Sequence, residues 1–171
     1  MRRGKPPVLN SHIIQEEHEV DVIPATGVCG CVGGMGPALG GGFGYYMGFY
    51  GLALDQIISL DVVLANGSTT EVSATSKPDL YWGMRGAGHN FGVVTQFKYK
   101  IYDRPTAKWY YTIMTFTPDK LEKFFELLNS QNAGGEQAKE LVTYSLYAMD
   151  PATSTTEASL AHVDWYLRLY V

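Results

Sequence analysis

The sequence predicts an α+β fold whose two parts meet near Arg104 and Pro105. The first part is rich in strand patterns and contains a short helix pattern. The second part, from Lys108 onward, shows the order strand, helix, strand. The chain has 171 residues, 46% of them hydrophobic, which is enough for one core and at most a second small one.

Glycine is concentrated in one segment of the first part. Eleven of the 19 glycines lie between Gly27 and Gly51, and we call these residues the glycine loop. Such a density of glycine is typical of neither an ordinary helix nor an ordinary strand. Residues 19–24, just before the loop, alternate between apolar and polar side chains, which predicts a short strand that leads into it.

A β-hairpin is predicted after the glycine loop. Residues 57–65 are rich in Ile, Val and Leu and end at Asn66-Gly67, the strongest two-residue hairpin signal. Residues 68–73 form the predicted returning strand. Asn66-Gly67-Ser68 is also an acceptor sequence for N-linked glycosylation, which matters only in an exported protein.

A helix and a long strand complete the first part. Residues 76–79, Ser-Lys-Pro-Asp, predict a helix start, because a hydroxyl can cap the helix and proline is tolerated in its first turn. Gly86 and Gly88 predict that this helix is short. Residues 91–102 alternate, which predicts a long strand. One side of it is formed by Phe91, Val93, Thr95, Phe97, Tyr99 and Ile101.

The second part is predicted to hold a helix between strands. Residues 108–116 and 141–149 have strand patterns, and residues 117–119, Thr-Pro-Asp, open a helix. The apolar stripe of this helix must lie against a sheet or another helix, and it consists of Leu121, Phe124, Phe125 and Leu128. Residues 131–137 are a predicted loop and residues 151–156 a polar turn, whereas residues 157–171 fit either a helix or a strand.

Composition excludes several classes of partner. The net charge is −4, and the one basic cluster is Arg2, Arg3 and Lys5, which argues against a nucleic-acid groove. No apolar stretch approaches the roughly 18 residues that a membrane span needs. The chain as written has no export signal, so we expect a soluble, cytoplasmic protein.

Neither cysteine pairing nor a metal site is expected. Cys29 and Cys31 are one residue apart, and a disulfide across so short a loop would be strained. The four histidines are scattered, so no metal-ligand spacing is present.

The glycine loop has two interpretations. Residues 36–44, Gly-Pro-Ala-Leu-Gly-Gly-Gly-Phe-Gly, expose backbone N–H groups without side-chain bulk, which suits the pyrophosphate of a nucleotide. The alternative is close packing of backbone on backbone. The fingerprints of a P-loop and of a dinucleotide-binding βαβ unit are both missing.

Five segments carry a resemblance to a known family. They read Gly-Val-Cys-Gly-Cys-Val-Gly (27–33), Gly-Pro-Ala-Leu-Gly-Gly-Gly-Phe-Gly (36–44), Tyr-Gly-Leu-Ala-Leu-Asp (50–55), Val-Val-Leu-Ala-Asn-Gly (62–67) and Pro-Asp-Leu-Tyr-Trp-Gly-Met-Arg-Gly-Ala-Gly-His-Asn-Phe-Gly-Val-Val-Thr (78–95). In this order and spacing they resemble the second half of the FAD-binding domain of berberine-bridge-enzyme-like, FAD-linked oxidoreductases. The amino-acid sequences of these segments are similar to those of fungal members that serve secondary-metabolite pathways.

The resemblance implies a domain division. Residues 1–104 would be part of a PCMH-type FAD-binding domain, with a mixed or antiparallel sheet and short helices, and residues 105–171 the start of an α+β substrate-binding domain. Full-length members also carry a second glycine-rich phosphate loop, a flavin-linking histidine and a catalytic base outside the region present here. We therefore expect exposed apolar surface that a second copy, in a homo-oligomer, or a larger partner covers.

The resemblance also implies cofactor contacts. FAD is the implied cofactor, and Cys29 falls where some members attach the flavin through sulfur. The other interpretation of Cys29, and the favoured one of Cys31, is a small packed side chain. The implied FAD-binding residues are Cys29, Gly33, Gly34, Gly36, Gly40, Gly41, Gly42, Gly44, Asp55, Val93 and Val94.

Three functions remain open at this stage. In the first, a flavin takes a hydride from a small organic substrate. The second is a flavin-free cyclase or isomerase that holds its substrate in a reactive conformer, and the third is a non-catalytic assembly partner. The candidate catalytic residues, each with a structural alternative, are Tyr45, Tyr46, Asp55, Trp82 and His89.

Overall fold

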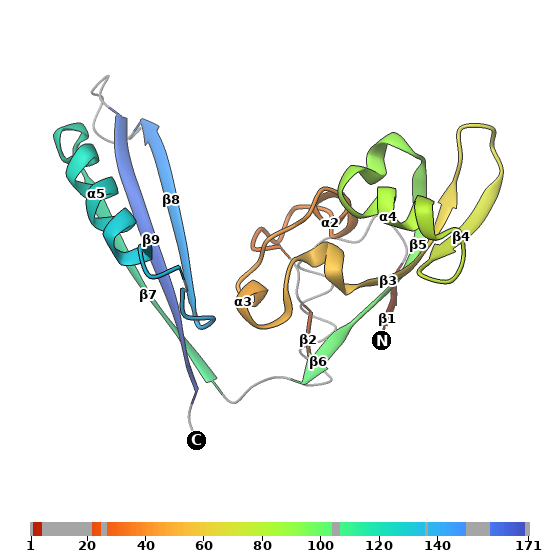
Figure 1. The fold of residues 1–171 in the computed structure, drawn as a ribbon, viewed down its shortest axis with the longest axis horizontal. Coiled ribbons are helices and arrows are strands. Elements are labelled where there is room, and N and C mark those ends of the chain that lie inside the picture. The colour runs from red at the N-terminus through yellow and green to blue at the C-terminus, as the bar shows by residue number, and fades with distance from the viewer. Residues whose placement is uncertain are drawn as a thin grey trace. The chain divides into compact units, whose positions relative to one another are not determined.

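The computed structural model describes residues 2–4, 22–24, 27–103, 107–135, 137–149 and 158–169 (Figure 1). The chain divides into two compact units, Met1–Pro105 and Thr106–Val171. Helices occur with antiparallel sheets in the described residues, which confirms the α+β prediction.

The first unit is built on a four-stranded antiparallel sheet. Its strand order is β1-β5-β3-β4. The strands are β1 (Arg2–Gly4), β3 (Ile57–Val63), β4 (Thr69–Ser73) and β5 (Val93–Tyr99). A separate antiparallel pair joins β2 (Val22–Pro24) to β6 (Ile101–Asp103), so the segment that leads into the glycine loop is anchored on the end of the predicted long strand.

Short helices surround the sheet of the first unit. They are α2 (Met35–Leu39), α3 (Met47–Tyr50), the 3-10 turn η1 (Ala53–Gln56), α4 (Pro78–Ala87) and the 3-10 turn η2 (Gly88–Asn90). The helices α2 and α3 both lie inside the glycine loop, where no helix was predicted. Because α2 buries Met35, Ala38 and Leu39, its apolar residues fix it to the core despite the surrounding glycines.

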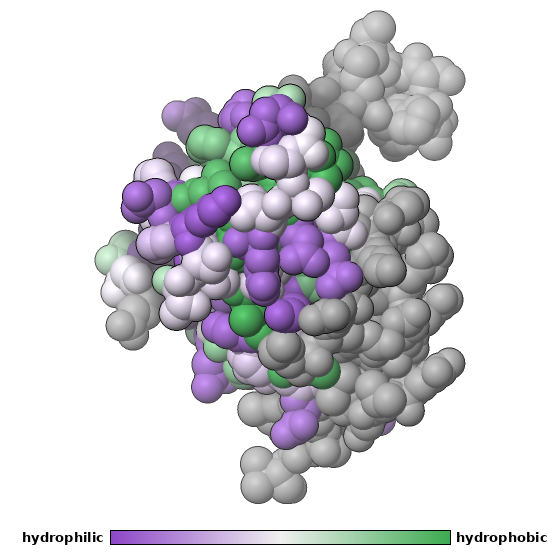
Figure 2. Space-filling model, turned by 90° about the vertical axis from the view of Figure 1, so that its right-hand side faces the viewer, coloured by the Kyte–Doolittle hydropathy of each residue, from purple (hydrophilic) through white to green (hydrophobic). Residues whose placement is uncertain are grey.

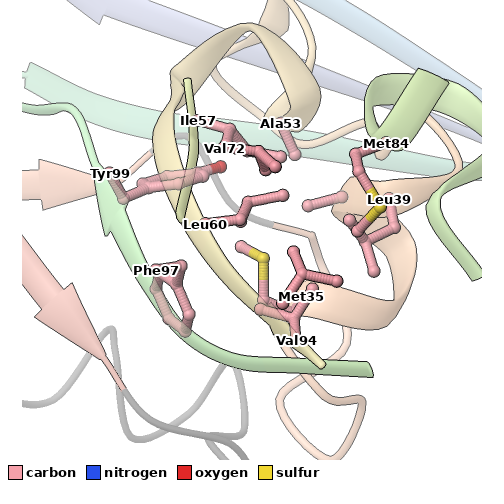
Figure 3. Close-up of a cluster of buried hydrophobic side chains, with 12 residues drawn as sticks. Met35, Leu39, Ala53, Ile57, Leu60, Val72, Met84, Val94, Phe97 and Tyr99 are labelled. Carbon is pink, nitrogen blue, oxygen red and sulfur yellow. The ribbon is translucent and has the colours of Figure 1, made fainter. Parts of the chain in front are cut away.

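The core lies between the sheet and the helices α2 and α4. Met35 and Leu39 point from α2, and Met84 from α4, toward the apolar residues of β3 and β5 (Figure 3). Leu60 and Met84 are fully buried. Burial of a side chain of this size contributes about 1.5–3 kcal/mol, so these contacts fix the helices that flank the glycine loop.

The predicted long strand is interrupted by a bulge. Asp61 pairs with Gln96 and Val62 pairs with Val94, so Thr95 is an extra residue that is not paired in the strand register. The extra residue reverses the alternation, and Val94 joins the core while Val93 is 67% exposed. The prediction that Val93 and Thr95 share a face with Phe97 is therefore wrong. The strand also stops at Tyr99, before β6 begins.

The β3–β4 hairpin is confirmed, but with a different turn from the one that Asn-Gly favours. Leu64 N–H donates to the Ser68 carbonyl and Gly67 N–H donates to the Leu64 carbonyl, both at 2.9 Å. Gly67 has φ +80, whereas Asn66 does not have a positive φ. The loop is thus a three-residue turn that ends in a left-handed glycine.

The helix predicted after residues 76–79 forms, but its cap differs. Lys77 precedes it in a left-handed conformation (φ +52), without a side-chain cap. The Ser76 hydroxyl donates to the Glu71 carbonyl (3.1 Å) and so ties the loop to β4 instead. The helix is kinked at Arg85 and at Gly86, whose φ is +140. The glycines were predicted to keep this helix short, and in the structure Gly86 forms part of a kink in it.

The second unit is a three-stranded antiparallel sheet with one helix. The strand order is β7-β9-β8. Its elements are β7 (Ala107–Phe116), the 3-10 turn η3 (Pro118–Lys120), α5 (Leu121–Asn132), β8 (Leu141–Met149) and β9 (Ala158–Leu169). The ambiguous tail is therefore a strand, and it is central because it pairs with both neighbours. Residues 151–156, predicted to be a turn, lie outside the described residues.

The helix α5 packs on the sheet through part of its predicted stripe. Phe124 is 9% exposed, and its ring centroid lies 5.1 Å from that of Phe116 on β7. Phe125, however, is 45% exposed, so it is not part of the buried contact. The stripe prediction holds at Phe124 and fails at Phe125.

We expect Tyr99 to make the first unit sensitive to alkali. Burial, and then the charges of Tyr102 and Asp55, raises the pKa of Tyr99 above its ordinary value of 10.0. The unfolded chain releases this proton at about pH 10, so its contribution to stability is present below that pH and is lost above it. Urea unfolding of Tyr99→Phe should show a shallower loss of stability between about pH 9 and pH 11 than the parent.

The control for this prediction is Tyr144→Phe, because the Tyr144 ring is exposed on β8. Its loss of stability with pH should match that of the parent. An equal slope in Tyr99→Phe and the parent would refute the assignment to Tyr99.

Candidate functional site

The glycine loop has a defined backbone with two left-handed glycines side by side. After α2 ends at Leu39, Gly41 and Gly42 have φ +121 and +74. A Cβ on Gly42 would lie 2.7 Å from the Cβ of Ala53 and 3.3 Å from the backbone of Pro37. Gly42 is therefore required both by its conformation and by the close approach of its neighbours.

The turn η1 anchors this part of the loop. Ala53 N–H donates to the Gly42 carbonyl (2.7 Å), and Leu54 N–H donates to the Gly41 carbonyl (2.9 Å). Both carbonyls thus point toward η1. The close-packing interpretation of the glycines is confirmed at Gly42.

The next N–H groups have no such partners. Within the described part of the chain, the N–H groups of Gly42, Phe43 and Gly44 donate to no other group. Gly44 is also buried. Buried N–H groups in proteins are nearly always paired with protein, water or ligand. The three successive N–H groups are therefore available to an acceptor outside the described residues, and the buried N–H of Gly44 needs one most.

Other glycines in the loop border open space. A Cβ on Gly33, Gly36 or Gly41 would meet nothing within 4 Å. Phe43 lies between two glycines and is 66% exposed. At the three glycines no described side chain fills the space beside the backbone, so another group can approach it there. The ligand-loop interpretation therefore keeps its support at these positions.

Asp55 is held within the fold by two groups. Its Oδ2 accepts from the Leu52 N–H (2.9 Å), and its Oδ1 accepts from the Arg85 guanidinium (3.1 Å). Arg85 also donates through Nε to the Leu54 carbonyl (3.1 Å). The ion pair joins the kink of α4 to η1, so both residues position the glycine loop through η1. Both side chains are partly exposed, which limits the energy of the pair.

A buried amide network holds the end of α3. Gln56 is fully buried, and its Nε2 donates to the carbonyls of Tyr50 (2.6 Å) and Leu52 (3.0 Å). The Tyr102 hydroxyl donates to the Gln56 Oε1. The rings of Tyr50 and Tyr102 are stacked with centroids 3.7 Å apart. Burial, and then Tyr50 and Asp55, raises the pKa of Tyr102, which favours the neutral donor.

This network was not predicted from the sequence. Gln56 and Tyr102 lie 46 residues apart, and no spacing rule connects them. A glutamine within an apolar run was the one signal available, because a buried amide needs partners.

The two cysteines lie at the start of the glycine loop, and both are exposed and not joined in a disulfide. The prediction that Cys31 is a packed side chain is therefore wrong, as is the packing alternative for Cys29. Tyr45 lies close enough to Cys29 to sense its charge: burial, and then Cys29, raises the pKa of Tyr45. The loop thus brings one predicted cofactor residue and one predicted catalytic residue together.

The remaining candidates are spread over the first unit, some on its surface and one in its core. Trp82 on α4 is 80% exposed and His89 on η2 is exposed. Tyr46 contacts Tyr50, with ring centroids 6.3 Å apart. Val94 has its side chain in the core. Gly34 and Gly40 border α2 as its N-cap and C-cap residues.

No helix in the described residues is long and apolar enough to cross a membrane. Within the same residues, no group of three or more His, Cys, Asp or Glu is placed to hold a metal ion.

Sequence comparisons connect the chain to flavoproteins. Residues 7–73 match the FAD binding domain family. A FAD-linked oxidoreductase of Penicillium roqueforti is 52% identical over 82% of this chain and 28% of its own length. A FAD-linked oxidoreductase of Pyricularia oryzae is 48% identical over 84% of this chain and 28% of its own length. The chain thus spans somewhat more than a quarter of these relatives.

Structural comparisons agree. The 6-hydroxy-D-nicotine oxidase of Arthrobacter nicotinovorans matches 97% of this chain and 36% of its own, with a TM-score of 0.78 and 28% identity. A xylooligosaccharide oxidase of Myceliophthora thermophila matches 94% of this chain and 33% of its own, with a TM-score of 0.73 and 32% identity.

Proposed function

We propose that this chain, which belongs to the berberine-bridge-enzyme-like FAD-linked oxidoreductases, forms part of the FAD site of an enzyme that oxidises a small organic substrate. Fungal relatives support a role in secondary metabolism. The observation that carries the proposal is that the N–H groups of Gly42, Phe43 and Gly44 have no hydrogen-bond partner within the described residues.

The glycine loop fits a flavin nucleotide. The N–H groups of Gly42, Phe43 and Gly44 would hold oxygen atoms of the cofactor, because backbone donors stabilise negative charge without steric bulk. Gly33 and Gly36 leave room for a planar ring. The exposed thiol of Cys29 supports its proposed role as an attachment point for the flavin.

In the proposed site the flavin supplies the redox chemistry, and residues of the chain position the flavin. When bound, the flavin supplies the hydride acceptor. The chain's own residues orient it: Arg85 and Asp55 hold η1, and η1 holds the carbonyls of Gly41 and Gly42. Tyr45 has a raised pKa and stays neutral at physiological pH, so its hydroxyl can donate a hydrogen bond near the loop.

Exposed apolar residues on the sheet of the second unit support the proposal that another polypeptide covers one of its faces. In the second unit, Ile113 and Tyr144 pair with the same residue of β9, so both project from the same face of the sheet. They are 60% and 55% exposed, and Tyr111 and Leu146 lie on the same face. We propose that further polypeptide covers this face, either a second copy or a longer homologue. On this basis a non-catalytic assembly role is the second candidate function.

The visible spectrum of the purified chain with added FAD, measured together with its solution mass, tests the proposal. We expect quenched flavin fluorescence and shifted flavin absorbance bands, with weak affinity. A flavin spectrum identical to that of free FAD at every protein concentration would contradict the FAD site. If such a chain also assembles with a longer homologue, the assembly role replaces the enzymatic one. A colourless chain that converts a substrate would indicate the flavin-free alternative.

A further inference from the structure

The hairpin between β3 and β4 carries an acceptor sequence that the proposed flavin site does not use. Asn66-Gly67-Ser68 is the one Asn-X-Ser/Thr sequence in the chain, because the other asparagines, at positions 10, 90, 129 and 132, lack a hydroxyl residue two positions later. The hairpin projects beyond the sheet at the upper right of Figure 1. Residues 65–69 are all exposed.

The side chain of Asn66 is arranged by the turn. Its Oδ1 accepts from both the Ser68 N–H (3.0 Å) and the Ser68 hydroxyl (2.7 Å). This Asx-turn directs the carbonyl end of the amide toward Ser68 and leaves Nδ2 as the outward end. Within the described part of the chain, Nδ2 has no hydrogen-bond partner.

The surroundings of the hairpin leave room for a large polar group. Gly67 has no side chain, and a Cβ there would meet nothing within 4 Å. Figure 2 views the molecule from the side on which β4 lies, and its described residues are mostly hydrophilic or neutral. In Figure 1 the tip of the hairpin lies away from α2 and α3, the helices of the glycine loop, so an oligosaccharide there would not cover that loop.

We propose that Asn66 is an acceptor site for an N-linked oligosaccharide when the chain enters the secretory pathway. A bond forms between Asn66 Nδ2 and the anomeric carbon of an oligosaccharide carried on a polyprenyl diphosphate. The sugar–phosphate bond breaks, the diphosphate leaves, and Nδ2 loses one proton. Ser68 supplies the hydroxyl that the acceptor sequence requires.

The experiment is translation of the full chain behind a cleavable signal peptide in the presence of microsomes. We expect one added core oligosaccharide, seen as a single upward shift on a gel that peptide N-glycosidase F removes. Asn66→Gln and Ser68→Ala should each abolish the shift, whereas Ser68→Thr should retain it. Since the oligosaccharide is added during translation, loss of the shift does not depend on whether a variant folds.

A second measurement tests whether the folded hairpin accommodates the sugar. Peptide N-glycosidase F should remove it from the native chain as completely as from the denatured chain, because the tip is exposed. A translocated parent chain without the shift would overturn the proposal. So would a shift that persists in Asn66→Gln, or an oligosaccharide released only after denaturation.

Discussion

Gly42→Ala is expected to destabilise the first unit by roughly 2–4 kcal/mol, because a left-handed alanine is strained and its Cβ overlaps a packed neighbour. The overlap is with the Cβ of Ala53, at 2.7 Å, which belongs to the turn that anchors the loop. Relief requires the loop to move away from η1, so the hydrogen bond from Ala53 N–H to the Gly42 carbonyl should also be lost. Urea unfolding followed by circular dichroism measures the change.

Gly67→Ala is the matched control for this substitution. Gly67 has a similar φ, +80 against +74, but a Cβ there would meet nothing within 4 Å. It should therefore show the conformational cost alone, about 1 kcal/mol. The affinity for FAD should fall in Gly42→Ala and stay unchanged in Gly67→Ala. Equal losses of stability in the two variants would show that the contact with Ala53 is not the cause.

Gln56→Leu is expected to cost roughly 3 kcal/mol, because it leaves three partly buried polar groups without their bond to this amide. The carbonyls of Tyr50 and Leu52 and the hydroxyl of Tyr102 all bond to this amide. Since Tyr50 ends α3, the substitution should also loosen the second half of the glycine loop. Hydrogen exchange of the amides of residues 47–51 should become faster.

Gln96→Leu provides the same chemical change at a different place. Gln96 is half-buried on β5, and its side chain makes no hydrogen bond within the described part of the chain. This variant should unfold within about 0.5 kcal/mol of the parent. A small effect at Gln56 as well would mean that the buried network does not hold α3.

Periodic patterns predicted most of the strands, since alternation and β-branched residues report burial directly. They failed where one extra residue changed the register, as Thr95 does between Val94 and Gln96. They also failed at α2, where Met35 and Leu39 form a helix because tertiary burial outweighs the glycines around it. The left-handed Lys77 had no signal in the sequence, because its conformation follows from the turn that joins β4 to α4.

The sequence predicted which segment forms the candidate site, but it did not predict the side-chain contacts that hold this segment in place. Glycine density identified the loop, because only glycine permits the approach of Gly42 to Ala53. The pair of Asp55 with Arg85 joins residues 30 positions apart, and the amide of Gln56 meets Tyr102 across 46. Such contacts are set by packing of the whole unit. The family resemblance implies that Asp55 contacts the cofactor. In the structure Asp55 positions η1, through its bonds to Leu52 and Arg85.

The most direct test of the FAD site is nuclear magnetic resonance of the ¹⁵N-labelled chain during titration with FAD. We expect the amide resonances of Gly42, Phe43 and Gly44 to move most, because their N–H groups gain acceptors. The amide of Gly67, in the distant hairpin, should stay in place. Unchanged resonances at Gly42–Gly44, with shifts elsewhere or nowhere, would contradict the claim that the glycine loop binds the flavin nucleotide.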